Sequence, residues 1–217
     1  MKLPVDTTIT VLLADDHEVV RAGYRRLLEN EGDIAVVAEA SNGRDAYLRY
    51  VDAAPDVVVM DLSMPETSGF EVSRRILSRD GNARILVFSV HETGAYLSQA
   101  LNLGILGYIS KRSASQVMVE AIREVARGRQ FIGEELRRHL AGAESAHEER
   151  VLDKLTAREF EVFCQLARGR SVEEIAVALN ISPKTVGNHY TQVKRKLDAA
   201  NVAALTLLAV RAGVIDH

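Results

Sequence analysis

Five polar side chains stand at the ends of four short apolar segments, and their types suit the chemistry of a cation and a phosphoryl group. They are Asp15 and Asp16 after residues 9–14, Asp61 after 56–60, Ser89 after 85–88 and Lys111 after 107–110. Clustered carboxylates repel one another unless a hard dication neutralises them, and carboxylate oxygens with water are the ligands that Mg²⁺ prefers. A hydroxyl and an ammonium suit phosphoryl oxygens, so the set fits phosphoryl transfer to a carboxylate nucleophile.

The elements that must position these residues follow an alternating pattern. Short apolar runs near 9–14, 34–40, 56–60, 84–89 and 106–110 predict five buried strands, and each is followed by a segment of helical periodicity. This alternation predicts an α/β fold with a doubly wound parallel sheet, of flavodoxin-like strand order 2-1-3-4-5. In that order the ends of the first, third, fourth and fifth strands meet at one edge. Any one of these polar residues alone is more simply a helix cap or a loop residue, whereas all of them together favour a site.

Composition limits the class of protein. The chain has 217 residues, of which 47% are hydrophobic, enough for one or two domains with their own cores. We expect no contact with a membrane, because no apolar stretch reaches the roughly 18 to 20 residues that span a bilayer and Met1–Thr10 lacks the pattern of a signal peptide. The single cysteine, Cys164, excludes an internal disulfide and predicts a cytoplasmic protein; we interpret it as a core thiol.

The acidic edge resembles the receiver domain of response regulators over residues 8–127. That family has an acidic pair after strand one, a phosphorylated Asp after strand three, Ser or Thr after strand four and Lys after strand five. The resemblance implies that Asp61 is the phosphoacceptor, that Asp15, Asp16, Asp61 and the Ser63 carbonyl hold Mg²⁺, and that Lys111 contacts the phosphoryl group. It also implies that Ser89 and Tyr108 form a switch pair. Arg112 departs from the family, in which proline or an acidic residue often follows the lysine. His17 is expected to be a solvent-facing residue of the first helical turn, and His91 carries no expected role.

The C-terminal part has a purely helical pattern. Thr156–Glu159 and Ser171–Glu174 have the sequence of capping boxes, and Ser182-Pro183 places an N-cap before a proline, so helices are expected to begin near 157, 172 and 183. A fourth is expected from about Ala200 to Ala212. The turn between the second and third is short enough for a helix-turn-helix. We therefore predict a receiver-like domain at 1–130, a flexible linker at 131–150 and an all-α, four-helix domain at 151–217.

The third of these helices is the candidate DNA-binding element. Helical spacing places Val186, Tyr190, Val193 and Leu197 on one side and Lys184, Asn188, Thr191 and Arg195 on the other. Cations suit phosphates, and asparagine can pair bidentately with adenine. Residues 151–217 carry nine Lys and Arg against seven Asp and Glu and are the only net basic part of the chain. A plain solvated face is the alternative, but the tight turn and the capped helix before it favour DNA.

This part resembles the LuxR-type helix-turn-helix over residues 151–213, through Leu155–Val162, Ala167–Gly169, Leu179–Ser182, Thr185, His189 and Lys196-Leu197. Joined to a receiver, it is similar to the NarL/FixJ class of response regulators. That resemblance implies a transcriptional regulator rather than an enzyme, whose only reactions are autophosphorylation and autodephosphorylation at Asp61. Its partners are then a sensor histidine kinase, double-stranded promoter DNA and a second copy of the chain. The expected DNA-binding residues are Ser182, Lys184, Thr185, Asn188, His189, Thr191 and Arg195. Gly187 and Asp198 depart from the family, which commonly has a basic residue and a glycine at these positions.

Two other functions remain open. A Mg²⁺-dependent phosphatase of the haloacid-dehalogenase type would use Asp61 as nucleophile, but such enzymes need a second Asp two residues later, where this chain has Ser63. A DNA-binding protein with a vestigial receiver is the other alternative, and the complete set of acidic and basic residues argues against it. The homodimer is a hypothesis that rests on the resemblance and on the apolar residues Val202, Leu205, Leu208 and Ala209 of the last helix.

Overall fold

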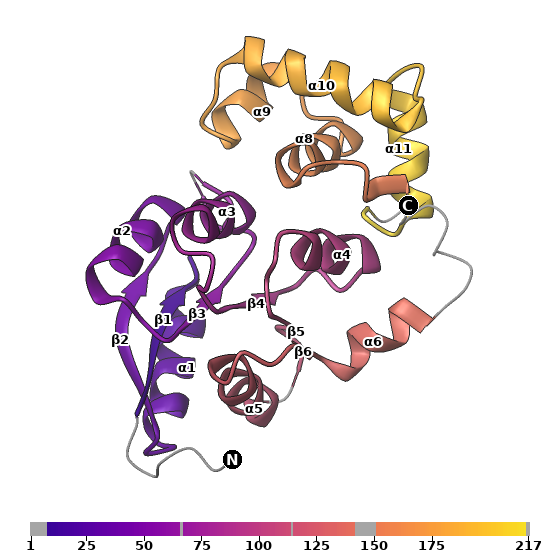
Figure 1. Ribbon diagram of the computed structural model, residues 1–217. Coiled ribbons are helices and arrows are strands. Elements are labelled where there is room, and N and C mark those ends of the chain that lie inside the picture. The colour runs from indigo at the N-terminus through magenta and orange to yellow at the C-terminus, as the bar shows by residue number, and fades with distance from the viewer. Residues whose placement is uncertain (1–7, 66, 114, 142–150, 216–217) are drawn as a thin grey trace. The chain divides into compact units, whose positions relative to one another are not determined.

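The computed structural model describes residues 8–65, 67–113, 115–141 and 151–215 (Figure 1). The chain divides into two compact units: residues 1–90 with 105–133, and residues 91–104 with 134–217. Residues 142–150, nine of the twenty residues of the expected flexible linker, lie outside the described residues. Among the helices of the described ranges, none is long and apolar enough to cross a membrane.

The first unit is built on a parallel sheet with the order β2-β1-β3-β4-β5-β6. Its strands are β1 (Ile9–Ala14), β2 (Ile34–Ala40), β3 (Val57–Met60), β4 (Ile85–Ser89), β5 (Gly107–Ser110) and β6 (Phe131–Ile132). The prediction of the strand order 2-1-3-4-5 is confirmed, but the prediction of only five strands is corrected by β6. This strand has two residues and pairs with Gly107 and Tyr108 of β5. Two residues are too few for a periodic pattern, so the sequence carried no signal for it.

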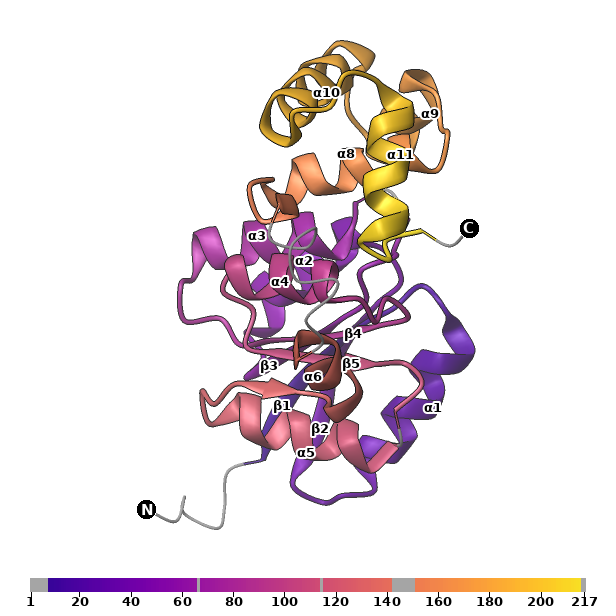
Figure 2. The same cartoon turned by 90° about the vertical axis from the view of Figure 1, so that its right-hand side faces the viewer.

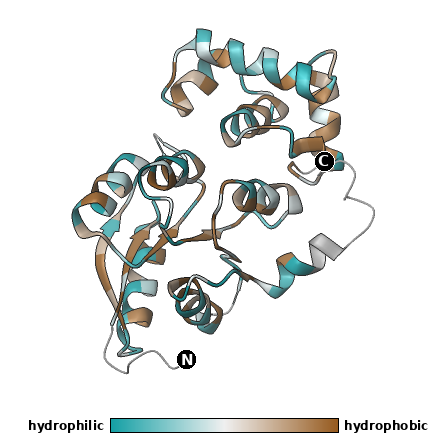
Figure 3. Ribbon diagram, in the orientation of Figure 1, coloured by the Kyte–Doolittle hydropathy of each residue, from teal (hydrophilic) through white to brown (hydrophobic). Residues whose placement is uncertain are grey.

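Helices cover both faces of this sheet (Figures 1 and 2). On one face α1 (Glu18–Glu29) contacts α5 (Ser115–Ala126), and on the other α2 (Gly43–Ala53) contacts α3 (Gly69–Arg79). Alternate strand residues belong to the core beneath α1 and α5, including Val11, Leu13, Val57, Val59, Leu86, Phe88 and Ile109. The residues between them are buried as well. Because both faces are covered, the strands are almost continuously apolar (Figure 3), which leaves their ends as the places for polar groups.

The second unit is helical. It contains α4 (Gly94–Asn102), α6 (Glu134–Ala141), α8 (Ala157–Ala167), α9 (Val172–Ala178), α10 (Pro183–Leu197) and α11 (Val202–Arg211). The predicted helix starts at 157, 172 and 183 are confirmed, with complete capping boxes at Thr156 and Ser171 and an N-cap at Ser182. The last helix is shorter than expected: it begins after Asn201, whose side chain accepts from the backbone N–H of Ala204.

Helix α4 packs on α8 through Tyr96. The Tyr96 ring meets Phe160 edge to face at a centroid separation of 5.0 Å, and the His91 ring stacks on it at a centroid separation of 4.0 Å. The Tyr96 hydroxyl donates to Cys164 Sγ over 3.6 Å and accepts from the Arg168 guanidinium over 3.4 Å. Burial lowers the pKa of His91 to about 4, so this imidazole is neutral at physiological pH. Cys164 is buried, as its expected core role requires.

Candidate functional site

The pairing of β1 with β3 brings two of the acidic residues together. Ala14 pairs with Met60, so Asp15 and Asp61 leave the sheet side by side, and the Asp61 amide donates to the Ala14 carbonyl over 2.8 Å. Potential ligand atoms of Asp15, Asp16, Asp61 and His17 all lie within 4.8 Å of one another. The acidic cluster expected at the carboxyl edge of the sheet is therefore formed.

Lys111 reaches the same cluster from β5. Its Nζ atom lies 2.7 Å from Asp15 Oδ2 and 2.8 Å from Asp61 Oδ2. The Lys111 amide also donates to the Ser89 carbonyl over 2.9 Å, which joins the ends of β4 and β5. Ser89 is the last residue of β4 and is fully buried. The carboxylates, the Lys111 ammonium and Ser89 thus lie at the same edge of the sheet.

Burial governs the electrostatics of this cluster. The side chain of Asp61 is only 1% exposed, and this burial raises its pKa although the Lys111 ammonium acts in the opposite direction. Burial also disfavours the charged form of Lys111, but hydrogen bonds and charges from Asp15 and Asp61 outweigh it and raise the pKa of Lys111. A cation bound beside Asp61 would favour the charged form of its carboxyl group.

The loop after β3 holds Asp61 through a close approach to the start of α3. The Gly69 amide donates to the Leu62 carbonyl over 3.1 Å, and a Cβ atom at Gly69 would lie 2.1 Å from the Asp61 carbonyl oxygen. Only glycine fits there without displacement of the backbone. Within the loop, the Ser63 amide donates to Asp61 Oδ1 over 3.2 Å, which fixes the carboxylate at the strand end.

Tyr108 and His17 differ in their relation to the acidic cluster. Tyr108 is fully buried in β5. The side chain of His17 is 63% exposed, as expected, but its Nδ1 atom lies 2.9 Å from Asp16 Oδ1 and 3.3 Å from Asp15 Oδ1. Sequence reasoning missed this proximity. Its signal was the adjacency of the three residues, because the short turn into α1 returns His17 over the preceding carboxylates.

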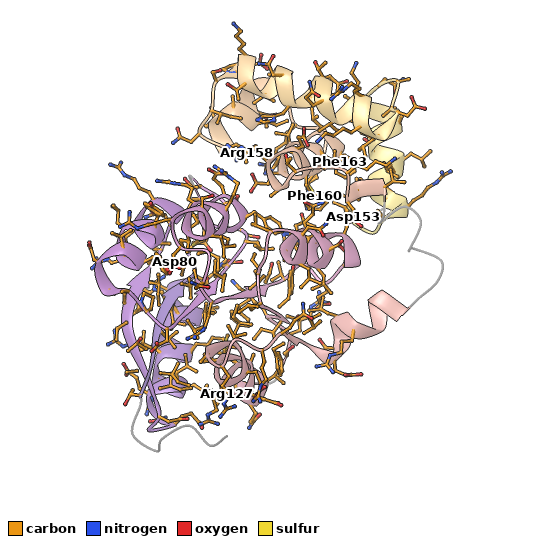
Figure 4. All side chains as sticks on the ribbon, viewed as in Figure 1. Asp80, Arg127, Asp153, Arg158, Phe160 and Phe163 are labelled. Atoms are coloured by element: carbon orange, nitrogen blue, oxygen red, sulfur yellow. The ribbon has the colours of Figure 1, made fainter. Side chains whose placement is uncertain are left out.

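A second candidate site is the helix-turn-helix of α9 and α10, which α8 holds at two points. Figure 4 labels Arg158, the α8 residue at one of these points. The Arg158 guanidinium donates to the Leu179 carbonyl at the end of α9 over 2.7 Å. Lys196, near the end of α10, lies 2.6 Å from Glu159 Oε2. In the turn, Asn180 has a φ of +51°, which asparagine tolerates better than most residues. These contacts fix both helices against α8.

Helix α10 has the two sides that were predicted. Val186 and Val193 are fully buried, whereas Lys184, Asn188, Thr191 and Arg195 are exposed. We call these four residues the exposed face of α10. The hydroxyl of Ser182 caps the helix by accepting from the Thr185 amide over 3.1 Å. His189 is half-buried, and its pKa is lowered by burial and by the charge of Arg158, which favours its neutral form.

The two departures from the helix-turn-helix pattern lie at distinct places. Gly187 is the fifth residue of α10, in the second turn of the helix. Asp198 ends α10 in the left-handed conformation, with φ of 51° and ψ of 41°. A glycine would adopt that conformation without strain, so the aspartate retains the geometry at a cost in stability.

Comparison with known proteins agrees with both halves of this description. Residues 11–123 match the model of the response regulator receiver domain, and residues 153–209 match that of the bacterial regulatory proteins of the luxR family. The chain belongs to the two-component response regulators that join a receiver to a LuxR-type helix-turn-helix, the NarL/FixJ class. It is a DNA-binding transcriptional regulator of a two-component system rather than a member of an enzyme family.

Particular relatives extend over nearly the whole chain. The response regulator UvrY of Escherichia coli K12 is 38% identical over 210 residues, which is 96% of this chain and 96% of UvrY. The response regulator GacA of Pseudomonas aeruginosa is 32% identical, over 96% of this chain and 98% of GacA. Among solved structures, RcsB of Salmonella enterica serovar Typhimurium, bound to promoter rprA with the phosphomimetic BeF3−, has a TM-score of 0.70 and 29% identity over 93% of this chain and 98% of RcsB.

Proposed function

We propose that Asp61 is the phosphoacceptor and that a sensor histidine kinase supplies the phosphoryl group. An oxygen of the Asp61 carboxylate attacks phosphorus, the bond from phosphorus to the histidine nitrogen breaks, and the nitrogen keeps the electron pair and takes up a proton. The convergence of Lys111 with Asp61, at 2.8 Å, is the observation that carries this proposal. The Lys111 ammonium can release the Asp61 carboxylate and bind an oxygen of the arriving phosphoryl group. The Ser89 hydroxyl can donate a hydrogen bond to another phosphoryl oxygen. Tyr108 is the proposed partner of Ser89 in the response to phosphorylation.

The donor set of the acidic cluster fits Mg²⁺. Asp15, Asp16 and Asp61 offer carboxylate oxygens within a span of 4.8 Å, and the Ser63 carbonyl is the fourth proposed ligand. A bound Mg²⁺ would offset the mutual repulsion of the carboxylates and the charge of the phosphoryl group. Asp61 keeps its nucleophilic role within this set, and Lys111 supplies positive charge from the end of β5.

Intact-protein mass spectrometry tests the phosphoacceptor. The full chain is incubated with Mg²⁺ and acetyl phosphate, beside Asp61→Ala and the control Asp52→Ala, which removes an exposed carboxylate of α2. One added phosphoryl group is expected on the native chain and on the control, and none on Asp61→Ala. The same adduct on Asp61→Ala, or none on the native chain with any small phosphodonor, would contradict the proposal. Removal of Mg²⁺ with EDTA is expected to abolish the adduct.

We infer that α10 enters the major groove of promoter DNA. Lys184, Asn188, Thr191 and Arg195 form its exposed face, and Ser182, Thr185 and His189 complete the proposed contacts. Cations on such a face contact phosphates, while the amide of Asn188 suits the edge of adenine. RcsB structures have been solved as dimers on DNA. We propose that this chain likewise binds DNA as a homodimer, because two half-sites bound together increase affinity. The proposed location is the cytoplasm.

The link between the two activities is proposed to run through α4. Ser89 ends β4, and α4 begins at Gly94 after a short loop. Helix α4 in turn contacts α8 through the packing of Tyr96 on Phe160, and the Gln99 side-chain amide donates to the carbonyl of Leu152, in the segment before α8, over 2.9 Å. A rearrangement at Ser89 would therefore act on the helix that holds α9 and α10. The proposed domain limits remain 1–130 for the receiver, 131–150 for the linker and 151–217 for the DNA-binding domain, with β6 and α6 inside the linker.

A further inference from the structure

The exposed face of α10 is interrupted by a glycine that packing does not require. Outside the backbone of its own helix, a methyl group added at Gly187 would meet no atom within 4 Å. The residue lies inside a 15-residue helix, where glycine is unfavourable relative to alanine. Neither a turn nor a close approach to another element explains it. The space beside Gly187 on the outer side of the helix is therefore open.

Thr191, one turn further along, borders the same space. Its hydroxyl donates to the Gly187 carbonyl over 2.9 Å, a common arrangement for threonine in helices. The hydroxyl proton is therefore used within the helix, and the methyl group is the remaining distinctive part of the side chain. Gly187 and Thr191 together form a small step without a charged side chain, between Lys184 on one side and Arg195 on the other. We call this step the Gly187–Thr191 notch.

We propose that the Gly187–Thr191 notch receives the 5-methyl group of a thymine in the operator. The proposal rests on the proposed docking of α10 in the major groove. The thymine methyl is the one apolar feature that base pairs present there, and threonine methyl groups are suited to contact it. The acceptor atoms of a guanine edge at the notch would lose water without gaining a comparable hydrogen bond, which is costly. A phosphate would find no cation within the notch itself.

The absence of a side chain at Gly187 then has a function. A β-carbon at this position would occupy the space of the methyl group and would hold the helix away from the bases. Asn188 follows directly in the sequence and suits adenine. We therefore infer that a thymine occupies the base step beside the one that Asn188 reads. The Gly187–Thr191 notch would make α10 select thymine by shape. The Thr191 hydroxyl cannot act as a donor to the base, because it already donates to the Gly187 carbonyl.

The test uses the full chain, treated with Mg²⁺ and acetyl phosphate, on duplexes that it selects from a random pool. In the selected duplex, each thymine is replaced in turn by uracil, which removes only the methyl group, and affinity is measured by fluorescence anisotropy. In each half-site, one thymine position is expected to be sensitive. Its replacement by uracil should weaken binding about fourfold, the effect of losing one buried methyl-sized group. Thr191→Val keeps a methyl group and is expected to retain the preference for thymine over uracil. Thr191→Ser lacks the methyl group and is expected to lose this preference.

Gly187→Ala supplies the second measurement. It is expected to raise the melting temperature of the protein, because alanine favours the helix, and yet to weaken binding to the thymine duplex more than to the uracil duplex. Unchanged affinity and unchanged thymine preference in Gly187→Ala would overturn the inference. So would equal binding of every uracil duplex by the native chain. Failure to retain any duplex from the pool would instead overturn the proposed DNA docking of α10, and the inference with it.

Discussion

The ion pair between Glu159 and Lys196 gives a quantitative test of how α8 holds α10. Lys196 Nζ lies 2.6 Å from Glu159 Oε2, and the two side chains are 27% and 8% exposed. The same carboxylate accepts from the Thr156 amide over 2.8 Å, in the capping box of α8. Lys196→Met keeps most of the length of the side chain and removes only the ammonium. The largely buried Glu159 carboxylate then keeps only its hydrogen bond from the Thr156 amide.

The expected loss of stability follows from these numbers. At the observed separation of 2.6 Å the bare attraction is about 6 kcal/mol for an effective dielectric constant of 20. Desolvation of the two groups offsets most of it, and hydrogen bonds to charged groups contribute a net 1.5 to 3 kcal/mol, roughly. Because Lys196 is partly exposed, we expect Lys196→Met to lower the free energy of unfolding by about 1 to 2.5 kcal/mol.

The loss should depend on pH. Burial acts to raise the pKa of Glu159, but the hydrogen bonds from Lys196 and Thr156 outweigh it, so the net pKa is lowered. A carboxyl group with a lowered pKa in the folded protein adds stability above its unfolded pKa and loses that contribution as the pH falls through the folded value. The difference between the native chain and Lys196→Met should therefore be largest near neutral pH and should shrink on acidification.

Native-state hydrogen exchange measured by mass spectrometry is the suitable assay. The chain has no tryptophan, and a protein of two units does not give one unfolding free energy from a single melt. Amides of α8 and α10 should lose the predicted protection in Lys196→Met. Lys184→Met, which removes an exposed cation of α10, is the control and should change stability by less than about 0.5 kcal/mol. Equal effects of the two variants, or no smaller effect of Lys196→Met in a Glu159→Gln background, would refute the reasoning.

Three further outcomes are expected. Asp198→Gly should raise the stability of the C-terminal helices by about 0.5 to 1 kcal/mol, since glycine adopts the left-handed conformation freely; no gain in hydrogen-exchange protection of α10 would contradict this. Gly69→Ala should greatly reduce phosphorylation by acetyl phosphate, because its Cβ would lie 2.1 Å from the Asp61 carbonyl oxygen, and mass spectrometry showing a native rate would count against the role of this contact. In the absence of Mg²⁺, the carboxyl group of Asp61 should titrate at a higher pH than an ordinary aspartate, because burial raises its pKa, and an NMR titration showing an ordinary value would contradict this.

Much of the sheet and of the acidic cluster could be predicted because local pattern and topology agree. A buried parallel strand is apolar throughout, so the residue at its end, such as Asp61, is conspicuous in the sequence. The strand order then determines which ends meet, and the pairing of Ala14 with Met60 confirms that step. The capping boxes were equally predictable, since each depends on two residues three apart.

Other features depend on contacts between distant residues. Nothing local indicated that His91 would stack on Tyr96. The packing of Tyr96 on Phe160 joins α4 to α8 across more than sixty residues of sequence. Periodicity reports only which side of a helix is apolar, not which element covers it. For that reason the sequence predicted the two functional sites but not the contacts proposed to connect them.

The central claim is that phosphorylation of Asp61 controls binding of promoter DNA. The most direct measurement is the affinity of the full chain for its selected duplex, with Mg²⁺, before and after addition of acetyl phosphate. The native chain and Asp52→Ala should bind more tightly after the phosphodonor is added, whereas Asp61→Ala should show no change. An equal response of Asp61→Ala, or no response of the native chain once its phosphorylation has been verified by mass, would contradict the claim.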